Sequence, residues 1–287
     1  MSGNPRFLVV DGYVKKARDE LAKGGATVAG PLYGAVLQRH LPGSSFDVIY
    51  PSDPGAAIPK GKALAGYDGV VWTGCSLTIF EDVPEVRAQI AFARAAYDAG
   101  IPSFGSCWGA QIAAVAAGGA VAANPKGREM GIARKIALTP LGRAHPLYVG
   151  KADVFDGFIS HYDEVTKLPP GGVRLAGNDF THVQSVAVKH GKGEFWGLQY
   201  HPEYDLHEMA RLVYCRIDRL IKDGFFKDRK AGEDYVTLME TLHADPKRKD
   251  IAWLLGVDAD VMDRKVRCVE VVNWLQRLVL PTMAKRR

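Results

Sequence analysis

Cysteine is scarce in this chain, and no cysteine has a close partner in the sequence. The four cysteines among 287 residues lie far apart, at Cys75, Cys107, Cys215 and Cys268. A structural zinc site commonly contains a CxxC pair, and a secreted disulfide framework needs several conserved pairs. The sequence therefore predicts no metal site and no disulfide, and it predicts a cytoplasmic location, where free thiols persist.

Long hydrophobic runs and a strong excess of one charge are also absent. No apolar segment reaches the length of a membrane span, and the apolar run at residues 7–10 is too short for a signal peptide. The formal net charge is only +5, and the basic clusters at residues 247–249 and 285–287 are short. We therefore expect neither a membrane nor a nucleic acid as a partner.

The first 120 residues alternate between short apolar runs and helical patterns. Apolar runs typical of buried strands lie at residues 6–10, 46–50, 69–72 and 102–106, and helical patterns at 34–40, 85–99 and 109–117. Pro84 and Gly100 bracket the second of these helices as start and stop signals. This alternation predicts an α/β fold with a mostly parallel central sheet flanked by helices.

The rest of the chain predicts short strands and then helices. We expect the strands to extend the sheet and add an antiparallel edge, at residues 132–138, 153–155, 158–160, 173–177, 184–188 and 194–199. Helices are expected at residues 206–220, 235–243, 252–255 and 259–280. The pattern predicts one domain over residues 1–221 and a helical C-terminal extension over 222–287, in which Trp253 and Trp274 would form a cap or a dimer surface.

A nucleophile is predicted where the strand at 102–106 turns into the next helix. Residues 105–109, Gly-Ser-Cys-Trp-Gly, have the G-x-C-x-G form of a nucleophile elbow. The glycines allow a tight turn, which holds the Cys107 side chain at the carboxyl edge of the sheet, where open α/β sheets bind ligands. A buried structural cysteine beside a tight turn is the alternative interpretation.

A base and an acid follow the strand at 194–199. His201 lies just beyond this strand, and Glu203 follows two residues later. Glu203 can orient the imidazole from the side that faces away from the sulfur of Cys107. A lone histidine would more often be structural, but a thiol, an imidazole and a carboxylate together are the parts of a covalent acyl-transfer site.

These motifs, in this order, resemble those of the class I glutamine amidotransferase family, in particular the glutaminase domain of GMP synthase. The G-x-C-x-G-x-Q motif extends to Gln111, and residues 201–203 match the HPE element. Residues 159–165, Ile-Ser-His-Tyr-Asp-Glu-Val, are similar to the S-H-x-D-x-V segment that lines the glutamine pocket of that branch. The resemblance runs from about Arg6 to Leu220, and it implies a flavodoxin-like sheet with residues 1–221 as the catalytic domain.

The resemblance also implies a mechanism. Cys107 would attack the γ-carboxamide of glutamine and form a γ-glutamyl thioester, His201 would protonate the leaving nitrogen and then activate water, and Glu203 would orient His201. The backbone N–H groups of Trp108 and Gly74 would hold the oxyanion. The loop at residues 72–76 departs from the Gly-Gly-Pro of many relatives, so Gly74 is the less secure of the two donors.

Five further residues are implied as substrate-binding: Gln111, Ser160, His161, Tyr162 and Asp163. Alternatives stay open for three of them. Gln111 can serve as a structural hydrogen-bonding group, and His161 more often orders its loop than transfers a proton. Asp163 either meets the α-amino group of the substrate or caps a turn.

The connection between the first strand and the helix near Gly34 is unusually long. This insertion, residues 12–33, starts at the carboxyl end of a strand and so on the side of the predicted site. It would form a lid or shape a leaving-group pocket for a substrate larger than glutamine. A solvent-exposed helix and loop is an equal alternative.

Three hypotheses for the function follow. Residues 221–287 are too few for an ATP-using domain, and neither a Ser-Gly-Gly-Val-Asp-Ser loop nor a GxxxxGK[ST] loop is present, so we expect no cofactor. The first hypothesis is a glutaminase that supplies ammonia to a separate ATP-using synthetase subunit. The alternative is a stand-alone hydrolase of γ-glutamyl-amine conjugates in a catabolic pathway. The third is a non-catalytic binding protein, against which the complete triad argues; whether the chain forms a homodimer stays open.

Overall fold

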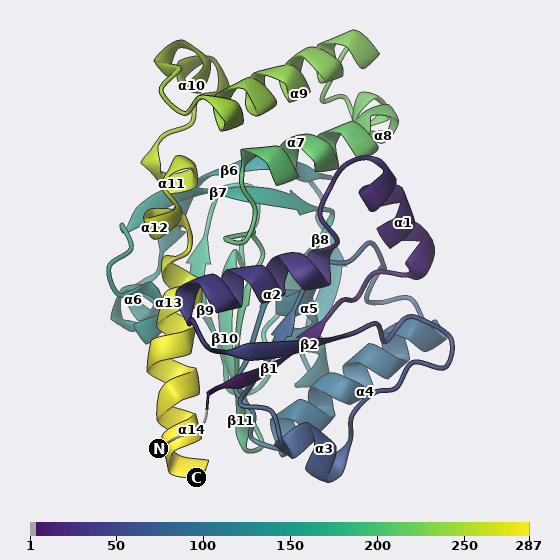
Figure 1. Cartoon of the computed structure of the whole chain (residues 1–287), viewed down its shortest axis with the longest axis vertical. Helices are drawn as coiled ribbons and strands as arrows, with labels where there is room; N and C mark the ends of the chain where they lie inside the picture. The colour runs from purple at the N-terminus through teal and green to yellow at the C-terminus, as the bar shows by residue number, and fades with distance from the viewer. Residues whose placement is uncertain (1–3, 287) are drawn as a thin grey trace.

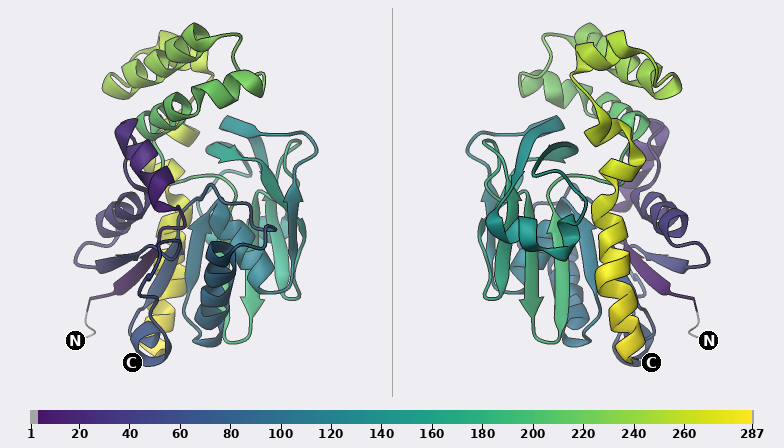
Figure 2. Two further views of the ribbon diagram at one scale, coloured as in Figure 1. Left: turned by 90° about the vertical axis from the view of Figure 1, so that its right-hand side faces the viewer. Right: turned by 90° about the vertical axis from the view of Figure 1, so that its left-hand side faces the viewer.

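A computed structural model describes residues 4–286, and its centre is a mixed β-sheet with helices on both faces (Figures 1 and 2). Within these residues the sheet has nine strands in the order β2-β1-β3-β4-β11-β10-β9-β6-β7. The first five in this order run parallel: β2 (Ser45–Ile49), β1 (Arg6–Val10), β3 (Gly69–Trp72), β4 (Ser103–Ser106) and β11 (Gly193–Leu198).

The other half of the sheet is antiparallel. It consists of β10 (Ser185–His190), β9 (Gly172–Gly177), β6 (Glu129–Leu138) and β7 (Val154–His161). The predicted α/β fold with an antiparallel edge is therefore confirmed. The two strands expected at 153–155 and 158–160 are one strand, because β7 pairs with β6 throughout this region. A separate two-stranded sheet, β5 (Ala120–Ala123) with β8 (Asp163–Lys167), was not predicted.

The two faces of the sheet carry separate hydrophobic cores, because successive side chains of a strand point to opposite sides. Leu8 and Val10 of β1 pack in the core beneath α4 (Pro84–Asp98) and α5 (Trp108–Ala116). Phe7 and Val9 pack in the core beneath α2 (Ala29–His40) and α13 (Val269–Trp274). The shorter elements of this part of the chain are α1 (Lys15–Lys23), α3 (Gly61–Ala65), α6 (Pro140–Ala144) and a 3₁₀ turn, η1 (Pro146–Tyr148).

A third hydrophobic cluster joins the helices at one end of the molecule, where α9 and α10 lie (Figure 1). Met209 and Leu242 are buried in it. Its helices are α7 (Leu206–Cys215), α8 (Ile217–Lys222), α9 (Arg229–Ala244), α10 (Lys249–Leu255) and α11 (Ala259–Met262). The helix predicted over 206–220 is thus two helices, α7 and α8, with a break at Arg216.

The last helices of the C-terminal extension belong to the main core. The Trp274 side chain of α13 is fully buried, and its ring centroid lies 5.8 Å from that of Phe7 and 5.5 Å from that of Phe104. After α13 the chain continues through a π-helical turn (Leu275–Val279) into α14 (Leu280–Arg286), which runs along the sheet as the yellow helix in Figure 2. The helical extension is present, but Trp274 packs against the sheet rather than forming a cap; the expected boundary at residue 221 stays a prediction.

The helix predicted over 259–280 is divided into short helices. Asp258 and Asp263 each accept a hydrogen bond from a backbone N–H two residues later, and so they cap α11 and α12 (Arg264–Arg267). Such capping aspartates are helix start signals: Asp258 marks the predicted start, and Asp263 marks a new start inside the apolar pattern.

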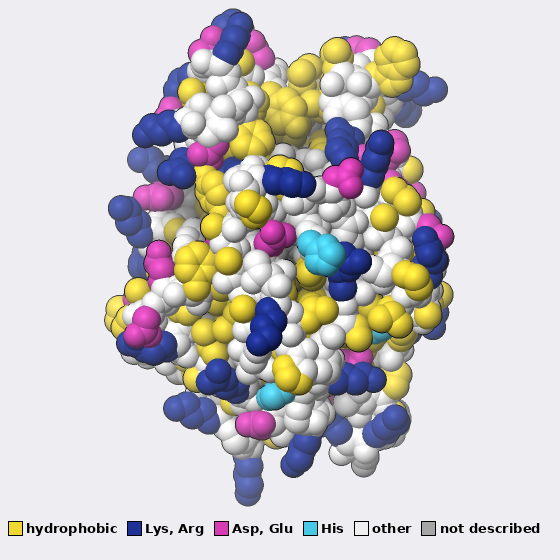
Figure 3. Space-filling view, turned by 180° about the vertical axis from the view of Figure 1, so that it is seen from behind, with side chains coloured by type: hydrophobic (Ala, Val, Ile, Leu, Met, Phe, Trp, Pro, Cys, Tyr) yellow, Lys and Arg dark blue, Asp and Glu magenta, His cyan; other side chains and the backbone are white. Residues whose placement is uncertain are grey.

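Among residues 4–286, no helix is both long and apolar enough to cross a membrane. On the face shown in Figure 3, Lys and Arg side chains are interspersed with acidic and hydrophobic side chains rather than gathered into one patch. The cytoplasmic location stays a prediction.

The two tryptophans of the C-terminal extension give a matched test of its role in the fold. Trp274→Ala removes a fully buried ring from the main core and should lower the free energy of unfolding by about 3–5 kcal/mol. Trp253, which is 92% exposed, is the control, and its replacement by alanine should change the value by less than about 0.5 kcal/mol. Urea denaturation measures both, and equal effects of the two variants would show that α13 is not part of the core.

Candidate active site

The parallel pairing of β4 with β11 brings the predicted thiol and imidazole together. Ser106, the last residue of β4, is in register with Leu198, the last residue of β11. The backbone N–H of Cys107 continues this ladder by donating to the carbonyl oxygen of Leu198 at 2.6 Å. Cys107 and His201 therefore leave neighbouring strands at the same edge of the sheet, and their side chains are close enough to interact electrostatically.

The backbone at Cys107 makes the sharp turn that the motif predicts. Cys107 has φ 52° and ψ −98°, a conformation that costs energy for a residue with a side chain, and α5 starts at the next residue. A Cβ atom on Gly105 would lie 2.8 Å from both the Cβ and the carbonyl oxygen of Trp72, so only glycine fits there. This strand-turn-helix geometry holds the sulfur of Cys107 at the carboxyl edge of the sheet, where its thiol lies 3.6 Å from the carbonyl oxygen of Ser160.

A buried chain of hydrogen bonds orients His201. Nδ1 of His201 lies 2.7 Å from Oε1 of Glu203, and both side chains are only 2% exposed. Ser106 donates its hydroxyl proton to the other carboxylate oxygen of Glu203 at 2.8 Å, and Tyr33 bonds to Ser106 in turn. The ring of Tyr204 stacks on the imidazole at 4.1 Å. With Nδ1 held by Glu203, the Nε2 atom of His201 is left to face the sulfur.

Electrostatics keep the His201 imidazole protonated at neutral pH. Burial alone lowers the pKa of His201, but the negative charge of Glu203 and the interactions with Cys107 and Glu203 outweigh it and raise the pKa to about 9. A protonated imidazole beside the sulfur is a proton donor for a leaving group.

The two predicted oxyanion donors lie on either side of the thiol. Trp108 is the first residue of α5, whose unpaired N–H groups point toward the turn. A Cβ atom on Gly74 would lie 3.1 Å from Cε1 of His201 and 3.9 Å from Cβ of Cys107. The backbone of Gly74 is thus close to the thiol and the imidazole, and the absence of a side chain keeps this space open.

A cavity of about 580 Å³ opens beside the thiol. Its walls include Cys107 and all five residues that the family resemblance implies as substrate-binding, namely Gln111, Ser160, His161, Tyr162 and Asp163. The cavity is large enough for a small-molecule substrate. The structure therefore brings the predicted residues together, and their individual roles stay predictions.

His161 and Gln111 both support the wall of this cavity. Nδ1 of His161 and the amide nitrogen of Gln111 each lie 3.0 Å from the carbonyl oxygen of Asp163. Nε2 of His161 lies 3.0 Å from the buried carboxylate of Glu129, which also accepts hydrogen bonds from Asn178, Thr181 and Gln184. Both ring nitrogens of His161 are thus engaged, which fits a residue that orders its loop.

The carboxylate of Asp163 takes no part in these hydrogen bonds, which involve only its backbone carbonyl. It is half-buried in the cavity wall, and no hydrogen bond joins it to a described residue. Burial raises its pKa. A carboxylate in this position can bind a cationic group of a ligand.

Three side chains near the site lie outside every sequence motif, namely Tyr33, Tyr13 and Arg216, and Ser106 occupies a variable position of the elbow motif. Tyr13 is buried, and its hydroxyl would lie 3.8 Å from a Cβ on Gly74. Arg216, at the break between α7 and α8, lines the cavity and bonds to the side chains of Ser160 and Tyr13. Tyrosine and arginine are common on protein surfaces, so only the fold shows that Tyr33, Tyr13 and Arg216 lie here.

The insertion at residues 12–33 combines features of both expectations, an exposed helix and a wall of the site. Most residues of α1 are exposed, as in the alternative of an exposed helix. Its two ends contribute Tyr13 and Tyr33 to the site. Arg18 anchors the insertion through an ion pair of 2.6 Å with Asp53, and Thr27 through hydrogen bonds to Glu208.

The other cysteines lie in different surroundings. Cys75 lines the cavity and bonds to the carbonyl oxygen of Gly12 at 3.1 Å, and burial strongly raises its pKa, which makes it a poor nucleophile. Cys268 is buried, as expected of a core residue, whereas Cys215 is only half-buried. Within residues 4–286, no group of three His, Cys, Asp or Glu side chains has the arrangement of a metal site.

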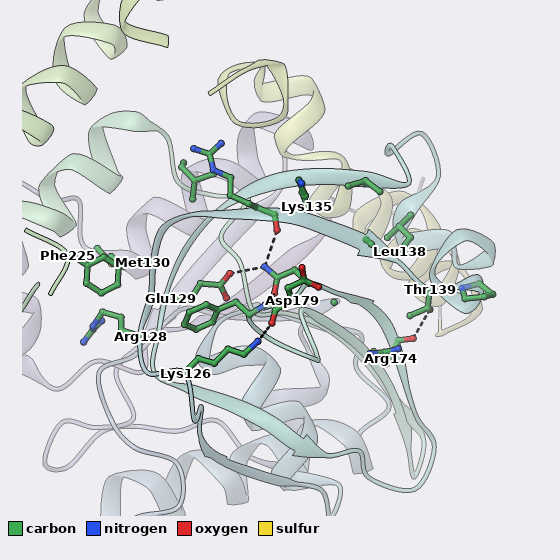
Figure 4. A pocket seen from close by; sticks show the side chains of 18 residues that line it. Lys126, Arg128, Glu129, Met130, Lys135, Leu138, Thr139, Arg174, Asp179 and Phe225 are labelled. Carbon is green, nitrogen blue, oxygen red and sulfur yellow. Dashed lines mark hydrogen bonds between the residues drawn. The ribbon is translucent and has the colours of Figure 1, made fainter. Parts of the chain in front are cut away.

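A second cavity, of about 1110 Å³, lies over β6 and the end of β9 (Figure 4). Two of its basic side chains are engaged within the protein: Lys126 with the carbonyl of Asp179, and Arg174 with His182. Glu129, which lines it, bonds to Asn178 there and to His161 on the other side. No cysteine lines this cavity, whereas Cys107 lines the smaller one, which is therefore the candidate active site.

Comparisons with known proteins agree with this site. The family profile described as glutamine amidotransferase class-I matches residues 48–215, more than half of the chain. A gamma-glutamyl-L-1-hydroxyisopropylamide hydrolase from Pseudomonas sp is 33% identical over 98% of this chain and 95% of its own length. A glutamine-hydrolyzing GMP synthase subunit from Methanoculleus marisnigri is 32% identical over 52% of this chain and 77% of its own length.

A solved structure shows the same fold. The crystal structure of a glutamine amidotransferase from Thermotoga maritima superimposes with a TM-score of 0.67 at 20% identity, over 96% of this chain and 98% of that one. The chain belongs to the class I glutamine amidotransferase family. It is an enzyme of the cysteine amidohydrolase type, which cleaves C–N bonds.

The pKa of His201 gives a test of the charge arrangement. In Glu203→Gln, burial is opposed only by Cys107 and no longer by the carboxylate, so the pKa of His201 should fall from about 9. NMR titration of isotope-labelled histidine measures this shift. An unchanged pKa would mean that Glu203 does not govern the charge of the imidazole.

The same pair affects stability in a defined pH window. Because the folded-state pKa of His201 is raised, its contribution is fully present below pH 6.5 and is lost as the pH rises through about 9. The free energy of unfolding of the wild type should therefore fall across this window more than that of Glu203→Gln.

Proposed function

We propose that this protein is a stand-alone hydrolase of γ-glutamyl amides in which an organic amine, rather than ammonia, leaves, and that it serves a catabolic pathway. The observation that carries the proposal is the end-to-end similarity to the Pseudomonas hydrolase, which covers nearly all of both chains. The similarity to the GMP synthase subunit covers about half of this chain. The matched region therefore includes the insertion and the C-terminal helices, and the relative that it matches is named for an amide hydrolase activity.

The reaction begins at Cys107. Its thiolate attacks the γ-carbonyl carbon of the substrate, and the C–N bond breaks as the protonated His201 gives its proton to the leaving nitrogen. The raised pKa of His201 and its electrostatic interaction with Cys107 support this role. The amine departs, and a γ-glutamyl thioester remains on Cys107.

Hydrolysis of the thioester completes the cycle. His201, now neutral, takes a proton from water, and the resulting hydroxide attacks the thioester carbonyl to release glutamate and the Cys107 thiolate beside a protonated His201. Glu203 keeps Nδ1 of His201 hydrogen-bonded in both steps, so that Nε2 alone exchanges protons. The N–H groups of Trp108 and Gly74 stabilise the oxyanion in both steps, and losing one such donor typically costs about 3 kcal/mol.

The substrate's amino-acid end lies against the wall formed by Gln111 and residues 160–163. The half-buried carboxylate of Asp163 pairs with the α-ammonium group, and the backbone position of Asp163 is fixed by His161 and Gln111. The buried hydroxyl of Tyr13, contributed by the insertion, lies beside His201 and therefore near the departing amine.

Glutamine hydrolysis for a separate synthetase is the second candidate function. The similarity to the Methanoculleus GMP synthase subunit favours it, because that protein is named for a glutamine-hydrolyzing enzyme. The two functions share Cys107, His201 and Glu203 and differ in the group that leaves.

A substrate panel separates them. The purified chain is assayed with glutamine, γ-glutamyl ethylamide and γ-glutamyl isopropylamide, and amine or ammonia release is followed. The proposal predicts a kcat/KM for the alkylamides at least about tenfold above that for glutamine, which is 1.4 kcal/mol of transition-state discrimination. A preference for glutamine would favour the glutaminase.

Cysteine variants identify the nucleophile in the same assay. Cys107→Ala should lower kcat by about 10³-fold or more, because the covalent route is lost. Cys215→Ala, which changes a half-buried thiol outside the cavity, should leave kcat unchanged. Residual turnover by Cys107→Ala near the wild-type rate would rule out the mechanism.

A further inference from the structure

Three arginines line the cavity beside the thiol, and two of them have an acidic partner. Arg128 lies 3.1 Å from the carboxylate of Asp223, and Arg219 lies 3.0 Å from the other oxygen of the same carboxylate. Both guanidinium groups also lie against the ring of Tyr162, Arg128 at 3.8 Å and Arg219 at 5.3 Å. These two arginines and Asp223 therefore form a self-contained cluster.

Arg216 differs because its contacts are neutral. One terminal nitrogen donates to the hydroxyl of Ser160 at 2.6 Å, and the other lies 3.5 Å from the hydroxyl of Tyr13. Among residues 4–286, no carboxylate forms an ion pair with it. A half-buried guanidinium without a counter-ion has lost part of its hydration with no charge to compensate, so an anionic ligand would bind favourably.

The position of Arg216 connects it to the reacting atoms. Ser160 accepts from Arg216 through its hydroxyl, and the carbonyl oxygen of the same residue is 3.6 Å from the sulfur of Cys107. Arg216 also occupies the break between α7 and α8, with φ −110° and ψ 10°, so the helix is interrupted at the residue that lines the cavity. The guanidinium is thus adjacent to the volume that a substrate on Cys107 must occupy.

We infer that Arg216 binds a carboxylate of the substrate and thereby determines which amides the enzyme accepts. The inference rests on the proposed function for the identity of the ligand. A γ-glutamyl amide can present a carboxylate in two places: the α-carboxylate of the glutamyl group, or a carboxylate carried by the amine. The geometry of a planar guanidinium suits either one, because both can accept two parallel hydrogen bonds.

Binding to the inactive Cys107→Ala protein tests the inference without turnover. Dissociation constants are measured by calorimetry for two ligand pairs, each differing by one carboxylate. γ-Glutamyl ethylamide is compared with 4-aminobutanoyl ethylamide, which lacks the α-carboxylate. γ-Glutamylglycine is compared with γ-glutamylglycinamide, which lacks the charge on the amine side. In one pair or the other, loss of the carboxylate should weaken binding by about 100-fold.

Arg216→Gln, added to Cys107→Ala, should reduce the discrimination within that pair to less than about threefold. It should leave unchanged the affinity for the member of the pair that lacks the carboxylate in question. The unchanged affinity shows that the site is still folded. Arg216→Lys should retain part of the discrimination, because the charge stays but the fork is lost. The control is Arg211→Gln. Arg211 lies on α7, forms an ion pair of 2.7 Å with Glu240, and does not line the cavity.

The outcomes distinguish failure of the inference about Arg216 from failure of the proposed function. The pair that loses its discrimination identifies which carboxylate Arg216 binds. Equal discrimination with and without Arg216 in both pairs, or no binding of any of the four ligands, would overturn the inference. If the ligands bind as expected but the wild type hydrolyses no γ-glutamyl amide, the proposed function fails and the role of Arg216 stands.

Discussion

The parallel pairing of β4 with β11 is the constraint on which the rest of the site depends. It places the last residues of two strands side by side, so a thiol that follows one strand meets an imidazole that follows the other. The hydrogen bond from the N–H of Cys107 to Leu198 extends this pairing into the turn itself. The two reacting groups thus belong to the rigid sheet, which is how an enzyme holds a nucleophile and a base in position without ordering them during the reaction.

Around this pair the protein buries two carboxylates and hydrogen-bonds both of them. Glu203 is almost fully buried and is engaged by His201 and Ser106, with Tyr33 behind Ser106. Glu129 does the same beneath the substrate wall, where His161 and three other side chains contact its carboxylate. A buried carboxylate is costly unless its oxygens are satisfied, so both networks rigidify the elements that carry them. Two charged groups of the cavity wall differ: Arg216 has only hydroxyl partners, and no hydrogen bond joins the carboxylate of Asp163 to a described residue.

How far the sequence predicts this arrangement depends on how local the signal is. Cys107 lies in a five-residue motif, and His201 and Glu203 in a three-residue one at a strand end, so their meeting could be predicted once a parallel sheet was expected. β5 and β8 carry no clear alternation of apolar and polar residues, and they were missed. The apolar stripe of α7 continues into α8, so periodicity gives no sign of the break at Arg216.

Contacts between residues far apart in the sequence are the second feature that the sequence does not predict. The apolar face of α13 indicates that Trp274 is packed, but the partners of its ring, Phe7 and Phe104, are more than 150 residues away, and only the folded chain identifies them. The same holds for Tyr13 and Tyr33, whose insertion reads equally well as a lid or as an exposed helix.

The most direct test of the central claim is a label that resembles the substrate. A γ-glutamyl chloromethyl ketone places a reactive carbon where the scissile amide lies, and a thiolate displaces its chloride to form a stable thioether. Mass spectrometry of digested protein should locate one label on Cys107, with labelling prevented by γ-glutamyl ethylamide and slowed in a His201→Asn variant. Labelling of Cys75 instead, or labelling of Cys107 that ignores both the competing amide and the loss of the imidazole, would contradict the account.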